Sequence, residues 1–256
     1  MQMTPYLGCN FHCIHCWRLH SNDRPGITWQ EFPPTIKKWD DPSFIIDECI
    51  EQRKLLLSGF GGHEKVDKKK FEEALKPTMM TASLTGEPLL YPYISEMVEE
   101  AKKRSVLTFI VTNGSLPKVL ENMDNLPFRL YISIYGPDKS TFVKIARPMV
   151  QDAWRKVNQT LELFPSLDTK KVFRILAIKG WNMKNIRGYA KLIEKSQPDF
   201  VEVKSYEWVG ESQKRLPQGA MPFMEDVREF AKRIAEETSY EIKDEFEPSG
   251  VILLTL

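Results

Sequence analysis

Three cysteines stand close together near the N-terminus, at Cys9, Cys13 and Cys16, with the spacing CxxxCxxC. Soft thiolates are the ligands that iron–sulfur clusters favour, and a loop this short can wrap one corner of a cubane cluster. Three thiolates leave one iron of a 4Fe–4S cluster without a protein ligand, so this iron is open to a substrate or cofactor. The spacing therefore indicates a cluster that takes part in a reaction rather than one that stores electrons.

Zinc and disulfide chemistry offer two other interpretations of these cysteines. A closed structural zinc site needs four ligands, so His12, His15 or His20 would have to complete it. A disulfide framework is typical of small secreted chains with an even, dispersed set of cysteines. This chain has four cysteines in 256 residues, three of them clustered. The pattern alone favours an iron–sulfur cluster over both alternatives.

Short apolar runs alternate with amphipathic segments along the chain, and these elements must position the cysteines. Runs rich in Val, Ile, Phe and Thr predict strands at Met80–Thr85, Val106–Asn113, Arg129–Tyr135, Val172–Lys179 and Phe200–Ser205. Segments long enough for crossover helices lie at Ile94–Arg104, Lys139–Ile145, Asp152–Phe164 and Asn185–Lys195. This alternation predicts an α/β fold, either a barrel or an open parallel sheet.

The ends of the chain complete this prediction. Met1–Leu7 is expected to form the first strand, which would place the cysteine loop at the carboxyl end of a strand, where α/β barrels gather their active sites. Ser43 is expected to cap a helix at Phe44–Leu57, and a further helix is expected at Phe223–Glu237. The tail from Tyr240 predicts a hairpin or edge strand. A chain of this length fits one domain, with a core at about 3–210 and an extension at about 211–256.

Composition and charge exclude several classes of protein. The 36 basic and 35 acidic residues leave a net charge of +1, so any surface for nucleic acid must be local. No apolar run approaches the roughly 18 residues that span a bilayer, and the first residues lack the basic and apolar regions of a signal peptide. Together with clustered thiols, these features predict a cytoplasmic protein with no membrane partner.

Polar side chains close several predicted strands at the mouth of the expected barrel. The second strand ends in Gly86-Glu87-Pro88, which by itself is an ordinary strand-to-helix turn. Arg174 and Lys179 are five residues apart, so within one strand they face opposite sides, and Lys179 lies nearer the mouth. Other polar residues at these strand ends are Asn113, Ser133, Glu202 and Lys204.

Placed one strand after CxxxCxxC, the Gly86-Glu87-Pro88 turn resembles the radical S-adenosylmethionine (SAM) superfamily over nearly the whole chain. The resemblance implies a partial (β/α)6 barrel with a C-terminal helix and a hairpin or edge-strand extension. It also implies that the three cysteines hold a 4Fe–4S cluster, that SAM chelates the open iron, and that the turn receives the SAM ammonium group. Arg174 matches the usual partner of the SAM carboxylate, and Asn113 and Ser133 are further expected SAM-binding residues.

Other motifs are similar to those of the archaeal type of tRNA 4-demethylwyosine synthase. They are Trp17-Arg18, Asp47–Leu56, Ala146-Arg147-Pro148 with Trp154, Lys179-Gly180-Trp181-Asn182, Pro198–Lys204 and Gly210-Glu211-Ser212. The resemblance implies an enzyme of the carbon–carbon lyase class that condenses two carbons of pyruvate with N1-methylguanosine 37 of tRNA-Phe. A 5′-deoxyadenosyl radical would take hydrogen from the N-methyl group, and an external donor such as ferredoxin or flavodoxin would supply electrons.

One departure from that family concerns its upstream segment, which carries three further cysteines for a second cluster and a lysine for pyruvate. This chain begins where that segment should end. The remaining thiol, Cys49, lies with Ile45, Ile46 and Ile50 on an apolar helical face, so we expect it to be a buried core residue and not a ligand. The sequence therefore predicts either a shortened form or a protein that works without the second cluster.

A tRNA anticodon loop needs basic groups for its phosphates and aromatic faces for an extruded base. Suitable residues near the strand ends are Arg147, Lys179, Lys204, Lys214, Arg215, Trp17, Trp181 and Trp208. The same residues also fit ordinary packing and solvated surface positions. The sequence identifies no catalytic residue, and Lys179 and Lys204 are named as candidates at the mouth. Two alternative functions stay open, namely a radical SAM enzyme with another substrate such as a peptide, and a metal-stabilised tRNA-binding module without catalysis.

Overall fold

The computed structural model describes residues 1–20, 23–26 and 32–256. Within these residues, one sheet of eight strands has the order β1-β2-β3-β4-β5-β6-β8-β7. Strands β1 to β6 are parallel to their neighbours, whereas β8 and β7 add an antiparallel hairpin at the β6 edge. The strands are β1 Gln2–Met3, β2 Met79–Ala82, β3 Leu107–Thr112, β4 Arg129–Ile134, β5 Lys170–Ala177, β6 Phe200–Ser205, β7 Glu241–Phe246 and β8 Val251–Thr255.

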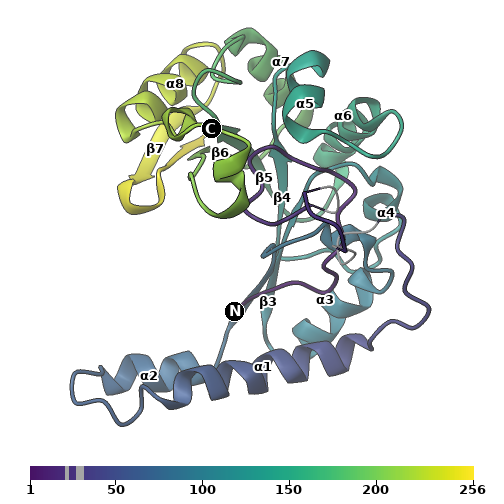
Figure 1. The fold of residues 1–256 in the computed structure, drawn as a ribbon, viewed down its shortest axis with the longest axis vertical. Coiled ribbons are helices and arrows are strands. Elements are labelled where there is room, and N and C mark those ends of the chain that lie inside the picture. Colours follow the sequence, from purple (N-terminus) through teal and green to yellow (C-terminus); the bar gives the residue numbers. More distant parts are fainter. Residues whose placement is uncertain (21–22, 27–31) are drawn as a thin grey trace.

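Helices connect the parallel strands, and α4, α5, α6 and α7 lie together along one side of them (Figure 1). Short crossover helices suit a parallel sheet, because each must return the chain to the start of the next strand. The helices are α1 Pro42–Ser58, α2 Lys68–Leu75, α3 Ile94–Lys103, α4 Pro117–Glu121, α5 Lys139–Ala146, α6 Ala153–Leu163, α7 Ile186–Ser196 and α8 Met224–Glu236.

The two faces of the sheet differ in burial. Leu130 and Ile132 of β4 are fully buried and join Phe173 of β5 in the main hydrophobic core under the helices. Tyr131 and Arg174, which alternate with them, are half-buried on the opposite face, where the guanidinium carbon lies 4.4 Å from the centre of the tyrosine ring. Period-two alternation therefore gives one dry face and one face that carries polar and charged groups.

An arm formed by α1 and α2 projects from one end of the sheet (Figure 1). Only Pro42 and Ile46 of α1 are buried, and no residue of α2 is. Leu55 and Leu56 are exposed near the end of α1. The arm is thus far less tied to the core than the strands and crossover helices are.

The predicted α/β architecture is confirmed as an open, parallel-rich sheet with a helix and hairpin after β6. The predicted first strand is much shorter than Met1–Leu7, because only Gln2 and Met3 pair with β2 before the chain turns into the cysteine loop. The predicted cap of the first helix is wrong. Asp41, not Ser43, is the N-cap, and its carboxylate accepts hydrogen bonds from the backbone N–H groups of Ser43 and Phe44. Pro42 at the first helical position fixes this start.

Cys49 is half-buried and packs against the main core, whereas the sequence predicted a buried core residue. The reason is that α1 contacts the body along a narrow strip centred on Ile46, and the rest of the helix faces outward. In the part of the chain that the structure covers, helices long and apolar enough to traverse a bilayer are absent.

Candidate cluster and cofactor site

The cysteine loop follows β1 and lies against the end of α5. The backbone N–H of His12 donates to the carbonyl of Arg147 at 3.1 Å, and that of Ile14 donates to the carbonyl of Ile145 at 2.9 Å. Phe11 and Pro148 form an isolated antiparallel bridge. Arg147 takes a left-handed conformation, with φ of 44°, which ends α5. The loop is therefore held by backbone pairing as an extra strand would be.

The three thiols lie in a largely dry environment. Cys13 is buried, Cys9 and Cys16 are half-buried, and all three are free of disulfide bonds. Burial raises the pKa of Cys9 to about 12 and raises the pKa values of Cys13 and Cys16, with the mutual repulsion of the thiols adding to the first two. Thiolates in such a setting need a compensating positive charge, and the irons of a cluster provide one.

The cysteine loop supplies three thiol groups as donors. Among residues 1–20, 23–26 and 32–256, no three Cys, His, Asp or Glu side chains are close enough to hold one metal ion. In a cubane cluster each thiolate binds an iron of its own. Soft thiolates without oxygen donors also match iron–sulfur chemistry.

The Gly86-Glu87-Pro88 turn packs directly on the start of the cysteine loop. The Glu87 backbone N–H donates to the carbonyl of Gly8 at 2.9 Å. Gly86 has φ of +72°, and a Cβ there would lie 2.5 Å from the carbonyl oxygen of Tyr6. Only glycine allows this approach and this conformation together. Pro88 begins the short 3-10 helix η1 Pro88–Leu90.

The carboxylate of Glu87 faces inward and ties this turn to the end of β3. Its side chain, which is 1% exposed, accepts hydrogen bonds from Thr112 Oγ1 at 2.7 Å, the Asn113 backbone N–H at 2.8 Å and the Leu89 backbone N–H at 3.1 Å. Burial raises the pKa of Glu87 to about 7, although these hydrogen bonds act in the opposite direction. The side chain thus supports the turn from within.

A buried polar network joins the end of β3 to the cysteine loop. Asn113 Nδ2 donates to Asn10 Oδ1 at 2.8 Å, and Asn10 Nδ2 donates to Ser115 Oγ at 2.7 Å. Ser115 Oγ in turn donates to Asn113 Oδ1 at 2.6 Å. All three side chains are buried. Asn10 was not predicted as a site residue, although its place directly after Cys9 was a signal for a side-chain hydrogen bond within the cysteine loop.

Ser133 of β4 and Tyr135 lie on the face of the sheet that reaches the cysteines. The ring of Tyr135 lies 4.7 Å from that of His15, between centroids. Burial raises the pKa of Tyr135 well above its ordinary value, and Cys13 and Cys9 add to the rise. Burial also lowers the pKa of His15 to about 3, so its imidazole is neutral. Tyr135 was not predicted as a site residue, although the period of two from Ser133 places it there.

The predicted cationic residues are separated by the fold. Arg174 pairs with Glu202 of β6, with Nε 2.7 Å from Oε1. Lys179 instead pairs with Asp226 of α8 at 2.7 Å, on the helical side of the sheet. Lys204 donates to the carbonyl of Ser249 and to Glu207, both at 2.9 Å. Each of these cations already has an acidic partner.

The candidate tRNA contacts also differ in exposure. Trp17 is 44% exposed directly after the last cysteine. Trp181 is half-buried, with Lys144 Nζ 4.6 Å from its ring centroid. Trp208 Nε1 donates to the carbonyl of Leu216, so the polar edge of this indole ring is bonded inside the protein. Trp17 is thus the most accessible aromatic face of this group.

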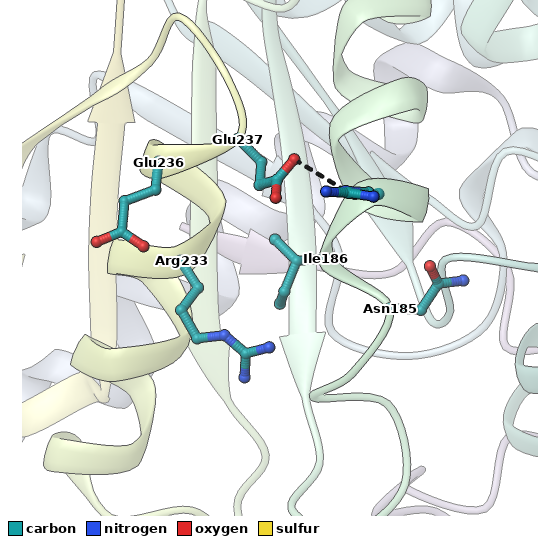
Figure 2. A pocket seen from close by; sticks show the side chains of 6 residues that line it. Asn185, Ile186, Arg233, Glu236 and Glu237 are labelled. Carbon is teal, nitrogen blue, oxygen red and sulfur yellow. Dashed lines mark ion pairs between the residues drawn. The ribbon is translucent and has the colours of Figure 1, made fainter.

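A separate pocket of about 330 Å³ lies between α7 and α8. Figure 2 shows its side chains, with Glu237 ion-paired to Arg187 at 3.5 Å across it. Arg233 and Glu236 also line it. None of the residues predicted for the cluster or cofactor lines this pocket, so it is not part of the site described above.

Comparison with known proteins identifies two matching family models. The Radical SAM superfamily model matches residues 3–193, and the model for wyosine base formation matches residues 195–256. The chain is 47% identical over 259 residues to S-adenosyl-L-methionine-dependent tRNA 4-demethylwyosine synthase of Pyrococcus horikoshii, covering 99% of this chain and 74% of that one. It is 31% identical over 256 residues to TYW1 of Homo sapiens, which is also named an S-adenosyl-L-methionine-dependent tRNA 4-demethylwyosine synthase. This match covers 99% of this chain and 34% of that one.

Solved structures agree with these matches. A structure of TYW1 with a lysine–pyruvate adduct bound has a TM-score of 0.86 and 32% identity, over 99% of this chain and 78% of that chain. A crystal structure of archaeal TYW1 has a TM-score of 0.74 and 30% identity, over 89% and 75%. Streptococcus suis SuiB bound to the precursor peptide SuiA has a TM-score of 0.58 at 14% identity, over 92% and 45%, which shows a common fold alone.

Proposed function

Because the chain belongs to the radical SAM superfamily, and within it to the tRNA 4-demethylwyosine synthases, we propose that it forms 4-demethylwyosine in tRNA. One observation carries this proposal. The segment matched by the wyosine model contacts the cysteine loop itself, since the backbone N–H of Glu211 donates to the carbonyl of Trp17 at 2.9 Å. The part of the chain specific to wyosine formation is therefore joined to the radical SAM motif.

The three thiols are proposed to bind one 4Fe–4S cluster, with a thiolate from each of Cys9, Cys13 and Cys16 on one iron. When bound, the cluster supplies the electron that cleaves SAM to methionine and a 5′-deoxyadenosyl radical. The protein holds the loop against α5, buries Cys13 and half-buries Cys9 and Cys16.

The SAM-binding residues proposed here are Gly86, Glu87, Pro88, Asn113, Ser133 and Arg174. The inward-facing carboxylate of Glu87 supports a role through backbone groups of the turn, because its own oxygens already accept three hydrogen bonds. Arg174 is paired with Glu202 in this structure, through Nε at 2.7 Å from Oε1. Lys179 and Lys204 are paired with Asp226 and Glu207, respectively.

The proposed substrates are pyruvate and N1-methylguanosine 37 of tRNA-Phe, and the proposed electron donor is a ferredoxin or flavodoxin. The names of the relatives support tRNA as the substrate, and the lysine–pyruvate adduct in the related TYW1 structure supports pyruvate. The exposed ring of Trp17 beside the last cysteine offers a stacking surface for an extruded base. The cytoplasm is the proposed location, as the transfer RNA and the reducing conditions require.

The alternatives have less support. The hypothesis of a peptide substrate is supported by the fold similarity to SuiB, and at 14% identity this similarity carries no functional argument. A binding module without catalysis conflicts with relatives that are named synthases across 99% of this chain.

An anaerobic reaction with reconstituted protein, dithionite, SAM, pyruvate and tRNA bearing N1-methylguanosine tests the proposal. Mass spectrometry should find both 5′-deoxyadenosine and 4-demethylwyosine in the digested tRNA. Deoxyadenosine without the tricyclic base would point to another substrate. A verified cluster that yields neither product would contradict the proposal.

A further inference from the structure

Arg215 is an almost completely buried cation behind the last cysteine. Its side chain is 9% exposed, and it follows the 3-10 helix η3 Gly210–Lys214 in the segment matched by the wyosine model. Nη2 donates to the carbonyl of Cys16 at 2.5 Å and to that of Arg18 at 2.9 Å. Two carbonyls on either side of Trp17 thus converge on one nitrogen of the guanidinium.

The other end of the guanidinium is also occupied. Nη1 lies 2.9 Å from His20 Nδ1 and 3.3 Å from Asp23 Oδ2. Asp23 in turn accepts a hydrogen bond from the backbone N–H of His20 at 2.7 Å. Both Nη atoms of Arg215 are therefore bonded inside the protein, and its Nε is buried without a hydrogen-bond partner among the described residues. The side chain lies against the cysteine loop, whereas the sequence suggested a tRNA contact at the surface.

The segment that carries Arg215 is itself firmly placed. The hydroxyl of Tyr206 donates to Ser212 Oγ at 2.9 Å, and the backbone N–H of Leu216 donates to the Ser212 carbonyl at 2.9 Å. Leu216 and Tyr206 form a second hydrophobic cluster with Ile14 of the cysteine loop, which is fully buried. The guanidinium thus reaches the loop from a rigid platform rather than from a flexible tail.

The platform also touches the loop through its backbone. Gly210 has φ of +57°, and a Cβ at this position would lie 2.4 Å from the carbonyl oxygen of Trp17. The next residue, Glu211, uses its backbone N–H to bond that same carbonyl. The carbonyls of Cys16, Trp17 and Arg18 are therefore all bonded to the segment that ends in Arg215.

The charge of Arg215 acts in the same direction as its geometry. The guanidinium places its positive charge directly behind the last cysteine, with Nη2 2.5 Å from the carbonyl oxygen of Cys16. A cation held beside a thiolate stabilises negative charge there, and a reduced cluster carries one more negative charge than an oxidised one.

We propose that Arg215 is a positioning residue for the cluster, fixing the backbone that carries Cys16 and favouring the reduced state by its charge. The inference rests on the proposed function, because it assumes that the three cysteines hold a 4Fe–4S cluster. It adds a role for the wyosine-specific segment, which on this view supports the electron-transfer centre as well as any substrate.

The test compares Arg215→Gln with Arg215→Lys in the full chain, reconstituted anaerobically without tRNA or pyruvate. Arg228→Gln is the matched control, because Arg228 lies on α8 and pairs with Glu245 of the hairpin. Two quantities are measured, namely the ratio of reduced to oxidised cluster at a fixed solution potential by electron paramagnetic resonance, and the rate of iron release to a chelator.

Arg215→Gln should lower the ratio of reduced to oxidised cluster about tenfold, which is about 59 mV for a one-electron couple, and should release iron several-fold faster. Arg215→Lys keeps the charge but loses the planar fork, so its ratio should stay within about twofold of the wild type while iron release remains faster. Arg228→Gln should match the wild type in both quantities.

An unchanged ratio in Arg215→Gln would overturn the proposal, even if iron release increased, because a purely structural tie does not alter the potential. If Arg215→Gln fails to fold, Arg215→Lys decides, and wild-type iron release in that variant would overturn the proposal. A wild-type chain that binds no cluster under these conditions would overturn the proposed function as well, so the two failures are distinguishable.

Discussion

The cysteine loop has two flanks that are held by different forces. On one flank, Asn10 joins a buried neutral network with Asn113 and Ser115 at the end of β3. On the other flank, the charged group of Arg215 bonds the carbonyls behind Cys16. The Asn113 and Ser115 side of the first flank belongs to residues 3–193, which match the Radical SAM superfamily model. Arg215 belongs to residues 195–256, which match the model for wyosine base formation.

This difference indicates a division of labour. Neutral amide networks are satisfied internally and respond little to salt or to the charge of the cluster, so they set the shape of the loop. A buried guanidinium adds charge beside the thiolates, so it affects the redox state as well as the shape. The two flanks are therefore expected to fail in different ways when they are altered.

The largest effect is expected between the flanks, at Cys13. Cys13→Ala removes the buried thiol of the loop and leaves two ligands, which do not retain a cubane cluster. We expect 5′-deoxyadenosine formation to fall below detection in anaerobic assays analysed by mass spectrometry. Cys49→Ala on α1 is the control and should keep its full iron content. Undiminished SAM cleavage by Cys13→Ala would contradict the cluster assignment.

On the neutral flank, Asn113→Ala should lower the free energy of unfolding by about 2–4 kcal/mol. The substitution leaves Asn10 Oδ1 without its donor and removes the acceptor of the Ser115 backbone N–H and hydroxyl, and each unsatisfied buried group costs about 1–3 kcal/mol. Urea unfolding of the cluster-free chain measures this loss. Asn122→Ala, at the exposed end of α4, should stay within about 0.5 kcal/mol of the wild type. Equal losses in both variants would show that the network adds nothing.

Much of the fold was predictable, because strong signals are local. The run Phe200–Ser205 became β6 with unchanged bounds, since its alternation of apolar and polar residues matches a half-buried strand. The cysteine spacing and the Gly86-Glu87-Pro88 turn were equally local. The prediction of the α1 cap failed because two residues with good capping propensity, Asp41 and Ser43, flank one proline. Propensity alone does not choose between them.

Long-range partners in the site were not predictable. Arg174 meets Glu202 only because β5 and β6 are adjacent and in register, with these two residues directly opposite. Arg215 meets Cys16 across nearly two hundred positions, a contact that depends on the whole platform. A sequence read alone assigns such a cation to solvent or to a phosphate.

The neutral flank also contains a titratable group, Glu87, whose pKa burial raises to about 7 from an ordinary value near 4.5. The folded chain therefore binds a proton that the unfolded chain has released between these two pH values, so stability should fall as pH rises through this window and level off above it. The expected loss is on the order of 3 kcal/mol.

Urea unfolding of the wild type and Glu87→Gln between pH 4.5 and 7.5 isolates this contribution. The stability advantage of the wild type over Glu87→Gln should shrink as the pH rises. Because other groups titrate equally in both chains, they cancel in the difference. A difference that grows with pH would mean that the hydrogen bonds from Thr112 and Asn113 outweigh burial and hold Glu87 ionised.

The smallest effect is expected on the charged flank, at Asp23, and it should have the opposite sign to that of Arg215→Gln. Asp23→Asn removes a negative charge that lies 3.3 Å from Arg215 Nη1, so the net field at the cluster becomes more positive. The ratio of reduced to oxidised cluster at a fixed potential should therefore rise. The rise should be no more than about threefold, because the Asp23 side chain is 28% exposed and solvent screens its charge.

Paramagnetic resonance at low and high salt measures this rise, which should be smaller at high salt. Asp124→Asn, an exposed aspartate in the segment between α4 and β4, is the control and should leave the ratio unchanged. A lower ratio in Asp23→Asn would mean that the carboxylate mainly orients Arg215, because losing that orientation would outweigh the gain in positive charge. The charged flank would then resemble the neutral one, acting through shape rather than through charge.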